Sequence, residues 1–366
     1  MHIGKSYGII AFLRWTRRKA FVIAASAVVV TGLYQVAGWR WLALPWPVLA
    51  MLGTAASFIV GFKNAQTYSR TVEGQQIWSA ITASSRYWGL LSRDFPASGA
   101  AGAGLVNRHL AWLTAVRYQL REPRVWEAAA YTSNAEYRHR AFVVPEHAMP
   151  LETALAPYLG PGTAASLAGQ GAVPQALMAQ QSAALRALYG SGELVVLHYT
   201  EMQKTLKDLV DQHARAERLK NAPYPRQYAI VNTMFVWSFA LLLPLGMVKE
   251  FGQMPGAGFM AGQMAWLAVP FSCLIAWMYI ALDQVGESTD NPFEGGANDV
   301  PISRTCAMIA VELRTLMGRG RRSGTAGNRR QHRDVMRNAR RGARQAGARS
   351  AYPHRPTRRL RSAPAS

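Results

Sequence analysis

Four apolar segments, none of which contains Asp, Glu, Lys or Arg, constrain the fold of this 366-residue chain more than any other feature. Because a helix rises about 1.5 Å per residue, roughly 20 apolar residues cross a hydrocarbon core of about 30 Å. Inside that core only a helix or a closed barrel satisfies its own backbone, and runs of this length predict helices. The sequence therefore predicts an integral membrane protein with spans at 20–38, 42–62, 229–248 and 264–282.

Basic residues gather on one side of the predicted spans. Four lie between 14 and 19, before the first span, and four more lie between 215 and 226, before the third. The turns after these two spans contain only Arg40 and the pair Lys249 and Glu250. Because Lys and Arg near span ends stay in the cytoplasm, we expect a multi-pass protein of the plasma (inner) membrane with both termini cytoplasmic. A cleaved signal peptide is the alternative for the first basic and apolar run, but the apolar segment that follows at once favours an uncleaved span.

The spans divide the chain into five parts. These are a first hairpin (1–62), a cytoplasmic domain (63–226), a second hairpin (227–283), a cytoplasmic segment (284–318) and a tail (319–366). Helical spacing of apolar residues predicts that 66–93 prolongs the second span as one rod, and Pro96 with the run 97–104 then breaks the chain. Further helical patterns, separated by the Gly-rich stretch 160–171 and several prolines, cover 105–120, 125–135, 151–159, 174–189 and 193–219. No sustained strand alternation is present, so we expect an all-α membrane protein.

The tail holds most of the chain's net charge of +21. It contains fifteen arginines and one acid, Asp334, and has no hydrophobic period. Such a composition predicts disorder. Arginine-rich tails bind phosphate on lipid headgroups or on nucleic acid. We expect the anionic inner leaflet as the partner here, with nucleic acid as the less favoured alternative.

Residue patterns of catalytic or metal sites are missing from the sequence. His139 and His147 have no Cys or carboxylate at metal-ligand spacing, and Cys273 and Cys306 are isolated. The run Gly256–Gly258 matches only half of a dinucleotide-binding fingerprint and follows no strand, so it predicts a turn. We therefore predict that the chain is not an enzyme and needs no cofactor.

The second predicted span differs from the others in its arrangement of side chains. Thr54, Phe58 and Phe62 are spaced i, i+4 and i+8, so they share one helical face. Small residues around them, such as Gly53 and Gly61, allow neighbouring helices to approach closely. The spacing alone leaves two interpretations open, an aromatic packing stripe or the lining of a pore.

Three motifs resemble those of the bestrophin family, particularly its bacterial branch. The first follows the second span, the second precedes the third span, and the third follows the fourth span. Their matching residues are Gly61, Asn64, Tyr68, Arg70, Glu73 and Trp78; Glu217, Arg218, Pro223 and Pro225; and Asn291, Pro292 and Phe293. The motifs occur in the family's order, and this chain departs from the first one at Lys63, Ala65 and Thr71.

The resemblance implies an all-helical homopentamer in which the second membrane helix of each subunit lines a central ion path. Thr54, Phe58 and Phe62 would then form a narrow apolar neck, which can gate by dewetting. We expect a passive channel for chloride and other small anions, with a monovalent-cation channel of the same fold as the alternative. A second alternative is a non-conducting membrane scaffold whose basic tail docks lipid or nucleic acid. A secondary transporter is less favoured, because the spans contain no ionisable residue.

The family resemblance also implies a second constriction at the cytoplasmic end of the path. It falls on the proline-bracketed segment 219–225, where Ala222 and Tyr224 are the candidates. A plain helix start before the third span is the alternative.

Calcium gating like that of the animal bestrophins is not expected. The acidic run that follows the third motif in those channels is replaced here by a stretch with Gly295 and Gly296, which leaves only Asn291, Asn298 and Asp299 as a degenerate calcium clasp. These are too few oxygen ligands for a cation that takes six to eight. We expect the three residues to cap a turn and the helix that begins near Pro301.

Overall fold

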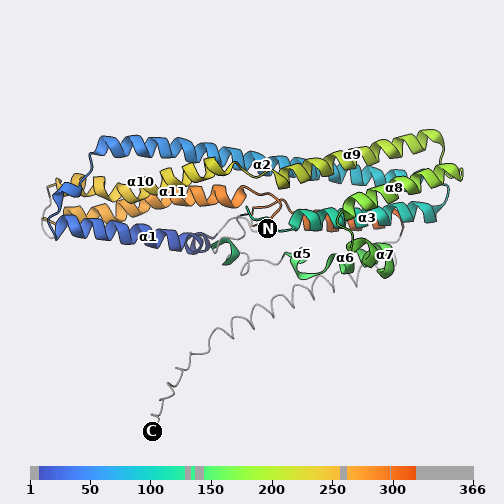
Figure 1. Cartoon of the computed structure of the whole chain (residues 1–366), viewed down its shortest axis with the longest axis horizontal. Helices are drawn as coiled ribbons and strands as arrows, with labels where there is room; N and C mark the ends of the chain where they lie inside the picture. Colours follow the sequence, from blue (N-terminus) through green and yellow to red (C-terminus); the bar gives the residue numbers. More distant parts are fainter. Residues whose placement is uncertain (1–7, 128–132, 137–143, 256–261, 297, 319–366) are drawn as a thin grey trace, which may run out of the picture. The chain divides into compact units, whose positions relative to one another are not determined.

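The computed structural model describes residues 8–127, 133–136, 144–255, 262–296 and 298–318, and these residues form helices and connecting turns without a strand (Figure 1). The all-α fold class is thus confirmed for the described part of the chain. The arginine-rich tail, 319–366, lies outside the described residues. The helices are α1 (Ile9–Gln35), η1 (Arg40–Leu42), α2 (Trp46–Asp94), α3 (Gly99–Arg121), α5 (Pro145–Ala148), α6 (Leu151–Leu159), α7 (Pro161–Ala168), α8 (Val173–Gly190), α9 (Val196–Asn221), α10 (Arg226–Gly252), η4 (Met264–Leu267), α11 (Ala268–Thr289) and α12 (Ile302–Leu316).

Helix α2 is the element that connects the two ends of the compact unit. It runs without interruption for 49 residues, which corresponds to about 73 Å, so the predicted rod is present. The helix begins at Trp46 rather than at 42, because Pro45 precedes it and Pro47 occupies its first turn. Proline is tolerated there, since the first backbone N–H groups have no partner within a helix.

Two hydrophobic clusters form on different lengths of α2. Figure 1 shows α10 and α11 beside its first half with α1 on their other side, and α3, α8 and α9 at the other end of the bundle. The first cluster joins Val60 to residues of α1, α10 and α11. The second joins Ile77 and Trp88 to residues of α3, α6, α8, α9 and α12. Because α12 comes from the segment 284–318, this segment and the long insertion share one core.

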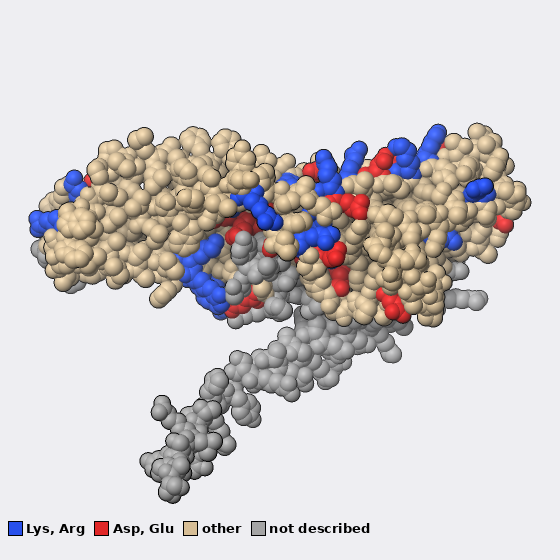
Figure 2. Space-filling model, viewed as in Figure 1, with Lys and Arg blue, Asp and Glu red and all other residues tan. Residues whose placement is uncertain are grey.

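Three helices are long and apolar enough to cross a membrane. They lie within Arg40–Asp94, Arg226–Gly252 and Met264–Thr289. Figure 2 shows few charges on the left half of the visible face, where Figure 1 places α1, α10 and α11. Helix α1, which contains the first predicted span, does not reach the same apolar length. Four basic residues occupy its N-terminal half, and it ends at Gln35 instead of continuing to Gly38.

The predicted breaks in the cytoplasmic part are partly wrong. The run 97–104 is not a loop, because α3 already begins at Gly99, where Ser98 caps it by accepting a hydrogen bond from the Ala101 N–H at 3.4 Å. A Cβ at Gly102 would collide with the Ser92 carbonyl oxygen, so glycine here serves close packing of α3 on α2. The stretch 160–171 contains the short helix α7. The prediction of a helix at 125–135 is also wrong in part, since 125–127 form a turn. Residues 133–136 are helical, and 128–132 lie outside the described residues.

Candidate functional site

The aromatic stripe of α2 lies on the outside of the subunit. Phe58 and Phe62 are 66% and 70% exposed, and Thr54 is exposed as well. The Thr54 hydroxyl donates a hydrogen bond to the Ala50 carbonyl oxygen at 2.8 Å, which directs this polar group back to its own helix. The stripe therefore takes no part in the core of a single subunit, so the interpretation as packing within the subunit is wrong.

The opposite face of α2 holds the helix against α10 and α11. At Gly53 a Cβ would lie 2.8 Å from the Phe239 ring of α10, so only glycine allows this approach. The Ser57 hydroxyl lies 2.6 Å from the Tyr279 hydroxyl of α11. Gly61 packs against no other helix of its own chain, since no atom of the described residues lies within 4 Å of a Cβ built there. These contacts fix the rotation of α2 and thereby direct its aromatic stripe outward.

The three sequence motifs meet around Arg70. Its Nε donates to the Asp290 carbonyl oxygen at 2.9 Å, and its Nη2 donates to the Leu219 carbonyl oxygen at 3.0 Å. Arg218 forms an ion pair with Glu73 of the first motif. Burial raises the pKa of Asp290, although the positive charge of Arg70 opposes the shift. Arg70 thus ties α2 to the two chain segments that enter and leave the second membrane hairpin.

The remaining motif residues differ in their surroundings. Pro292 and Phe293 pack on α2 at Gly74, where a Cβ would lie 3.2 Å and 3.3 Å from their side chains. Trp78 is buried, whereas Tyr68 is exposed. Asn64 faces Gly286 of α11, and Glu217 accepts hydrogen bonds from Gln119 and Gln175. Asn291 is buried, Pro223 is half-buried and Pro225 is exposed.

The degenerate calcium clasp is filled by a guanidinium group. Arg121 Nη1 donates to Asp299 Oδ2 at 2.8 Å and to the Phe293 carbonyl oxygen at 3.0 Å. Asp299 also accepts a hydrogen bond from the Gly295 N–H, while Asn298 is exposed. A divalent cation needs these same oxygens, so the residues present do not fit a calcium ion. Asp299 caps the turn as expected, but α12 has no side-chain cap at its start.

The segment in which a second constriction is predicted, 219–225, covers the end of α9 and the turn that leads to α10. Ala222 is exposed and Tyr224 is half-buried, with its ring 6.4 Å from that of Tyr228. Arg70 contacts Leu219 beside them, and Figure 1 shows α9 ending where α10 begins, near the middle of the bundle. The segment 219–225 is therefore at the junction of the two halves of the bundle, and not at the end formed by α3, α8 and α9. That end instead exposes an apolar run, 195–197, where α9 begins.

A buried ion pair joins α2 to α11 at the edge of the apolar region. Lys63 Nζ lies 2.6 Å from Asp283 Oδ1, and Asn232 of α10 donates to the same oxygen. Both charged side chains are buried. Sequence reasoning missed this pair, although each residue directly follows a predicted span, which is the signal that could have revealed it.

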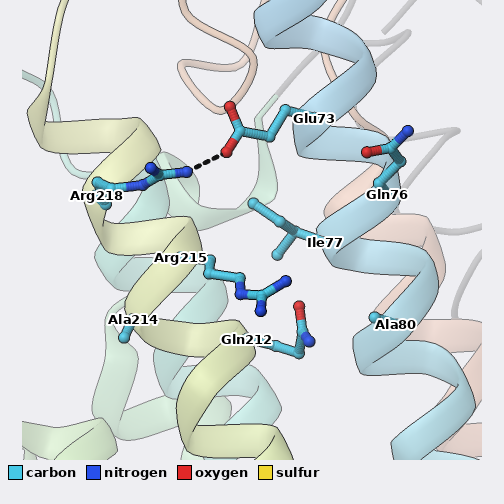
Figure 3. Close-up of a pocket in the computed structure, with 8 residues that line it drawn as sticks. All are labelled: Glu73, Gln76, Ile77, Ala80, Gln212, Ala214, Arg215 and Arg218. Carbon is cyan, nitrogen blue, oxygen red and sulfur yellow. Dashed lines mark hydrogen bonds and ion pairs between the residues drawn. The ribbon is translucent and has the colours of Figure 1, made fainter.

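An open groove of about 600 Å³ lies between α2 and α9, in the half of the bundle that also contains α3 and α8. Glu73, Gln76, Ile77 and Ala80 line it from α2, and Gln212, Ala214, Arg215 and Arg218 line it from α9. Figure 3 shows the Glu73–Arg218 pair bridging the two helices, with the side chains of Arg215 and Gln212 in the space farther along. Within the described residues, no group of His, Cys, Asp and Glu is arranged to hold a metal ion.

Comparisons with known proteins agree with this architecture. Residues 12–315 match the family described as "Bacterial/Fungal Bestrophin protein". The voltage-dependent anion channel-forming protein YneE of Salmonella typhimurium is 24% identical over 298 residues, which cover 80% of this chain and 83% of that protein. The protein of the same name from Escherichia coli K12 is 22% identical over 265 residues, or 72% and 74% of the two chains.

Solved structures show the same fold. A crystal structure of a bacterial bestrophin homologue from Klebsiella pneumoniae aligns with a TM-score of 0.66 and 20% identity, covering 82% of this chain and 98% of that one. Another, of its D179A variant, gives a TM-score of 0.68 over the same shares of the two chains. The family resemblance drawn from the three motifs is thus confirmed.

Proposed function

Because this chain belongs to the bacterial and fungal bestrophin family, a family of ion channels and not of enzymes, we propose that it conducts chloride and other small anions passively across the inner membrane. The observation that carries the proposal is the exposure of Phe58 and Phe62 on α2. Two large aromatic rings in line with Thr54, each about two-thirds exposed among the described residues, need an environment that this part of the subunit does not provide.

A ring of five subunits would give the stripe that environment. Each of Thr54, Phe58 and Phe62 would then contribute to one of three stacked rings around a central path. Such an apolar constriction offers few hydrogen bonds to a water column and can close by dewetting. In this arrangement α1, α10, α11 and the first half of α2 cross the membrane as four spans, and both termini lie in the cytoplasm.

The neck chemistry favours anions. It contains no acidic residue that would attract cations, and phenylalanine rings present a positive edge to a passing anion. The YneE relatives are named as anion channel-forming proteins, which points in the same direction.

The reversal potential of the purified full chain in planar bilayers under a potassium chloride gradient tests this proposal. We expect it to move toward the chloride equilibrium potential. Movement toward the potassium equilibrium potential would replace the proposal by the cation channel of the same fold. A chain that forms oligomers but passes no current would support the scaffold instead. Removal of 319–366 should leave the conductance of a channel unchanged, because the tail is not part of the proposed path.

A second constriction is proposed on the same path. Ala222 and Tyr224 remain candidates at the junction, and exposed Leu197 at the start of α9 is a third. Substitution of each by glutamate should lower anion conductance only at the position that lines the path. If none of the three variants alters selectivity or conductance, the constriction does not involve these positions.

A further inference from the structure

The groove between α2 and α9 lies in line with the aromatic stripe of the membrane half. Gln76 follows Phe58 by 18 residues, and Ala80 follows Phe62 by 18 residues. Eighteen residues are five turns of an α-helix, so each pair lies on the same side of α2, about 27 Å apart. Helix α2 is uninterrupted over this distance. If the stripe lines the ion path, the α2 wall of the groove faces the cytoplasmic continuation of that path.

The charges of the groove leave one positive group without a counterion. Glu73 and Arg218 neutralise each other in their ion pair. Arg215, one helical turn before Arg218, has neither a hydrogen bond nor an ion pair within the part of the chain that the structure describes. The nearest acid on its own helix face, Asp211, is held by Lys207 at 2.6 Å. The groove therefore presents a net charge of one positive unit per subunit.

The polar groups beside Arg215 suit a small anion. In Figure 3 the Arg215 guanidinium and the Gln212 amide both lie between α2 and α9. Gln76 also lines the groove, from α2, but Figure 3 shows its amide on the side of α2 away from the Arg215 guanidinium. Guanidinium and amide N–H groups are donors that replace part of the water around an anion. Because the groove is open, a bound anion keeps the rest of its hydration and can leave again, as conduction requires.

We infer that Arg215, with Gln212 beside it, forms a transient site for small monovalent anions in the cytoplasmic part of the path and contributes to anion selection there. This inference rests on the proposed function. The hydrophobic neck controls whether water and ions pass, whereas the Arg215 site raises the local concentration of anions over cations. In an oligomer the free guanidinium groups of the subunits add to the same field.

Charge neutralisation tests the site in the full chain. A unit charge about 6 Å from an ion in water changes the local ion concentration by about threefold. Arg215→Gln should therefore lower the anion-to-cation permeability ratio, measured from the reversal potential, by about threefold or more. Arg215→Lys should retain the ratio. Arg186→Gln is the matched control, because Arg186 is an exposed arginine on α8 that does not line the groove.

Charge replacement separates an effect of the charge from an effect on folding. In Arg215→Cys, a reagent that adds a cationic thioethyl ammonium group should restore the permeability ratio, and one that adds a sulfonate should lower it further. The unmodified chain, treated with both reagents, accounts for Cys273 and Cys306. An Arg215→Gln channel with an unchanged ratio would overturn the Arg215 site and leave the proposed anion channel standing. A cation-selective unmodified chain would overturn both.

Discussion

The phenylalanines of α2 point outward in its membrane half, whereas its tryptophans Trp78 and Trp88 point inward in the other half, which we propose lies in the cytoplasm and call the cytoplasmic half. Phe58 and Phe62 are about two-thirds exposed, whereas Trp78 and Trp88 are at most 2% exposed. Trp88 packs near the buried His109 ring, with 6.2 Å between centroids. One helix thus offers two large rings of its membrane half to surroundings outside the subunit, while two tryptophans of its cytoplasmic half belong to the subunit's own core.

This difference separates two roles for the same residue type. Burial of a large aromatic side chain stabilises the subunit that buries it. An aromatic side chain exposed on a subunit contributes little to that subunit's stability and can serve lipid, another subunit or an ion path. Substitutions of aromatic residues in the cytoplasmic half should therefore mainly lower the stability of the subunit, and those in the membrane half should mainly change the conductance.

Truncation of Trp88 should give the largest effect on stability. Trp88→Ala removes a fully buried ring and should lower the free energy of unfolding by about 3–5 kcal/mol. Phe62→Ala, the matched change on the same helix, should cost less than about 0.5 kcal/mol. Chemical unfolding of both purified variants in detergent measures the difference. Equal losses would remove the distinction between the two halves of α2.

Disruption of the Lys63–Asp283 ion pair, at the boundary between the two halves of α2, should have the second-largest effect on stability. Lys63→Met leaves Asp283 buried without its cation and should cost about 3 kcal/mol. Lys63→Met combined with Asp283→Asn should recover most of this loss, because no charge is left unpaired and Asn232 keeps a partner. The same unfolding measurement applies. A double variant no more stable than Lys63→Met alone would show that the pair is not the cause of the loss.

The Arg121–Asp299 pair should stabilise the cytoplasmic half without creating a calcium sensor. Asp299→Ala should lower the free energy of unfolding by about 2–3 kcal/mol, since Arg121 keeps its carbonyl partners. Asn298→Ala, at an exposed position, should change it by less than about 0.5 kcal/mol. Bilayer currents should not respond to micromolar calcium. A micromolar response that Asp299→Ala abolishes would contradict the assignment of Arg121 as the occupant of this loop.

The smallest expected effect concerns pH. Burial lowers the pKa of His109 to about 3 from its ordinary 6.5. Below pH 6.5 the unfolded chain binds a proton that the folded chain does not, so stability falls by about 1.4 kcal/mol per pH unit as pH decreases toward 3. Above pH 6.5 this contribution is fully present. His109→Phe should flatten the slope of unfolding free energy between pH 6 and pH 5 by about that amount. An unchanged slope would show that another group dominates the acid response.

The sequence predicts features that depend on neighbours along one helix, and misses those that depend on distant partners. The long α2 and the shared face of Thr54, Phe58 and Phe62 follow from helical periodicity. The glycines of 99–104 suggested a break, because the packing of Gly102 against Ser92 cannot be seen without the position of α2. Spacing also cannot distinguish a buried stripe from an exposed one.

Partners far apart in the chain account for the missed parts of the site. Asp299 has its partner 178 residues away in Arg121, and Lys63 has its partner 220 residues away in Asp283. Each residue taken alone looks like an ordinary surface charge. The three motifs predicted the family but not their common meeting point at Arg70, which required the fold.

The central claim is that the stripe of Thr54, Phe58 and Phe62 lines the ion path. A comparison of the conductance of Phe58→Ala with that of Phe21→Ala tests it most directly. Phe21 on α1 is 74% exposed, so both changes remove a ring from an exposed position of an apolar helix. Single-channel recording of each full-length variant in planar bilayers should show higher conductance or open probability for Phe58→Ala, because a wider neck holds more water. Phe21→Ala should match the unmodified chain. Identical currents in all three proteins would contradict the assignment of the α2 stripe to the ion path.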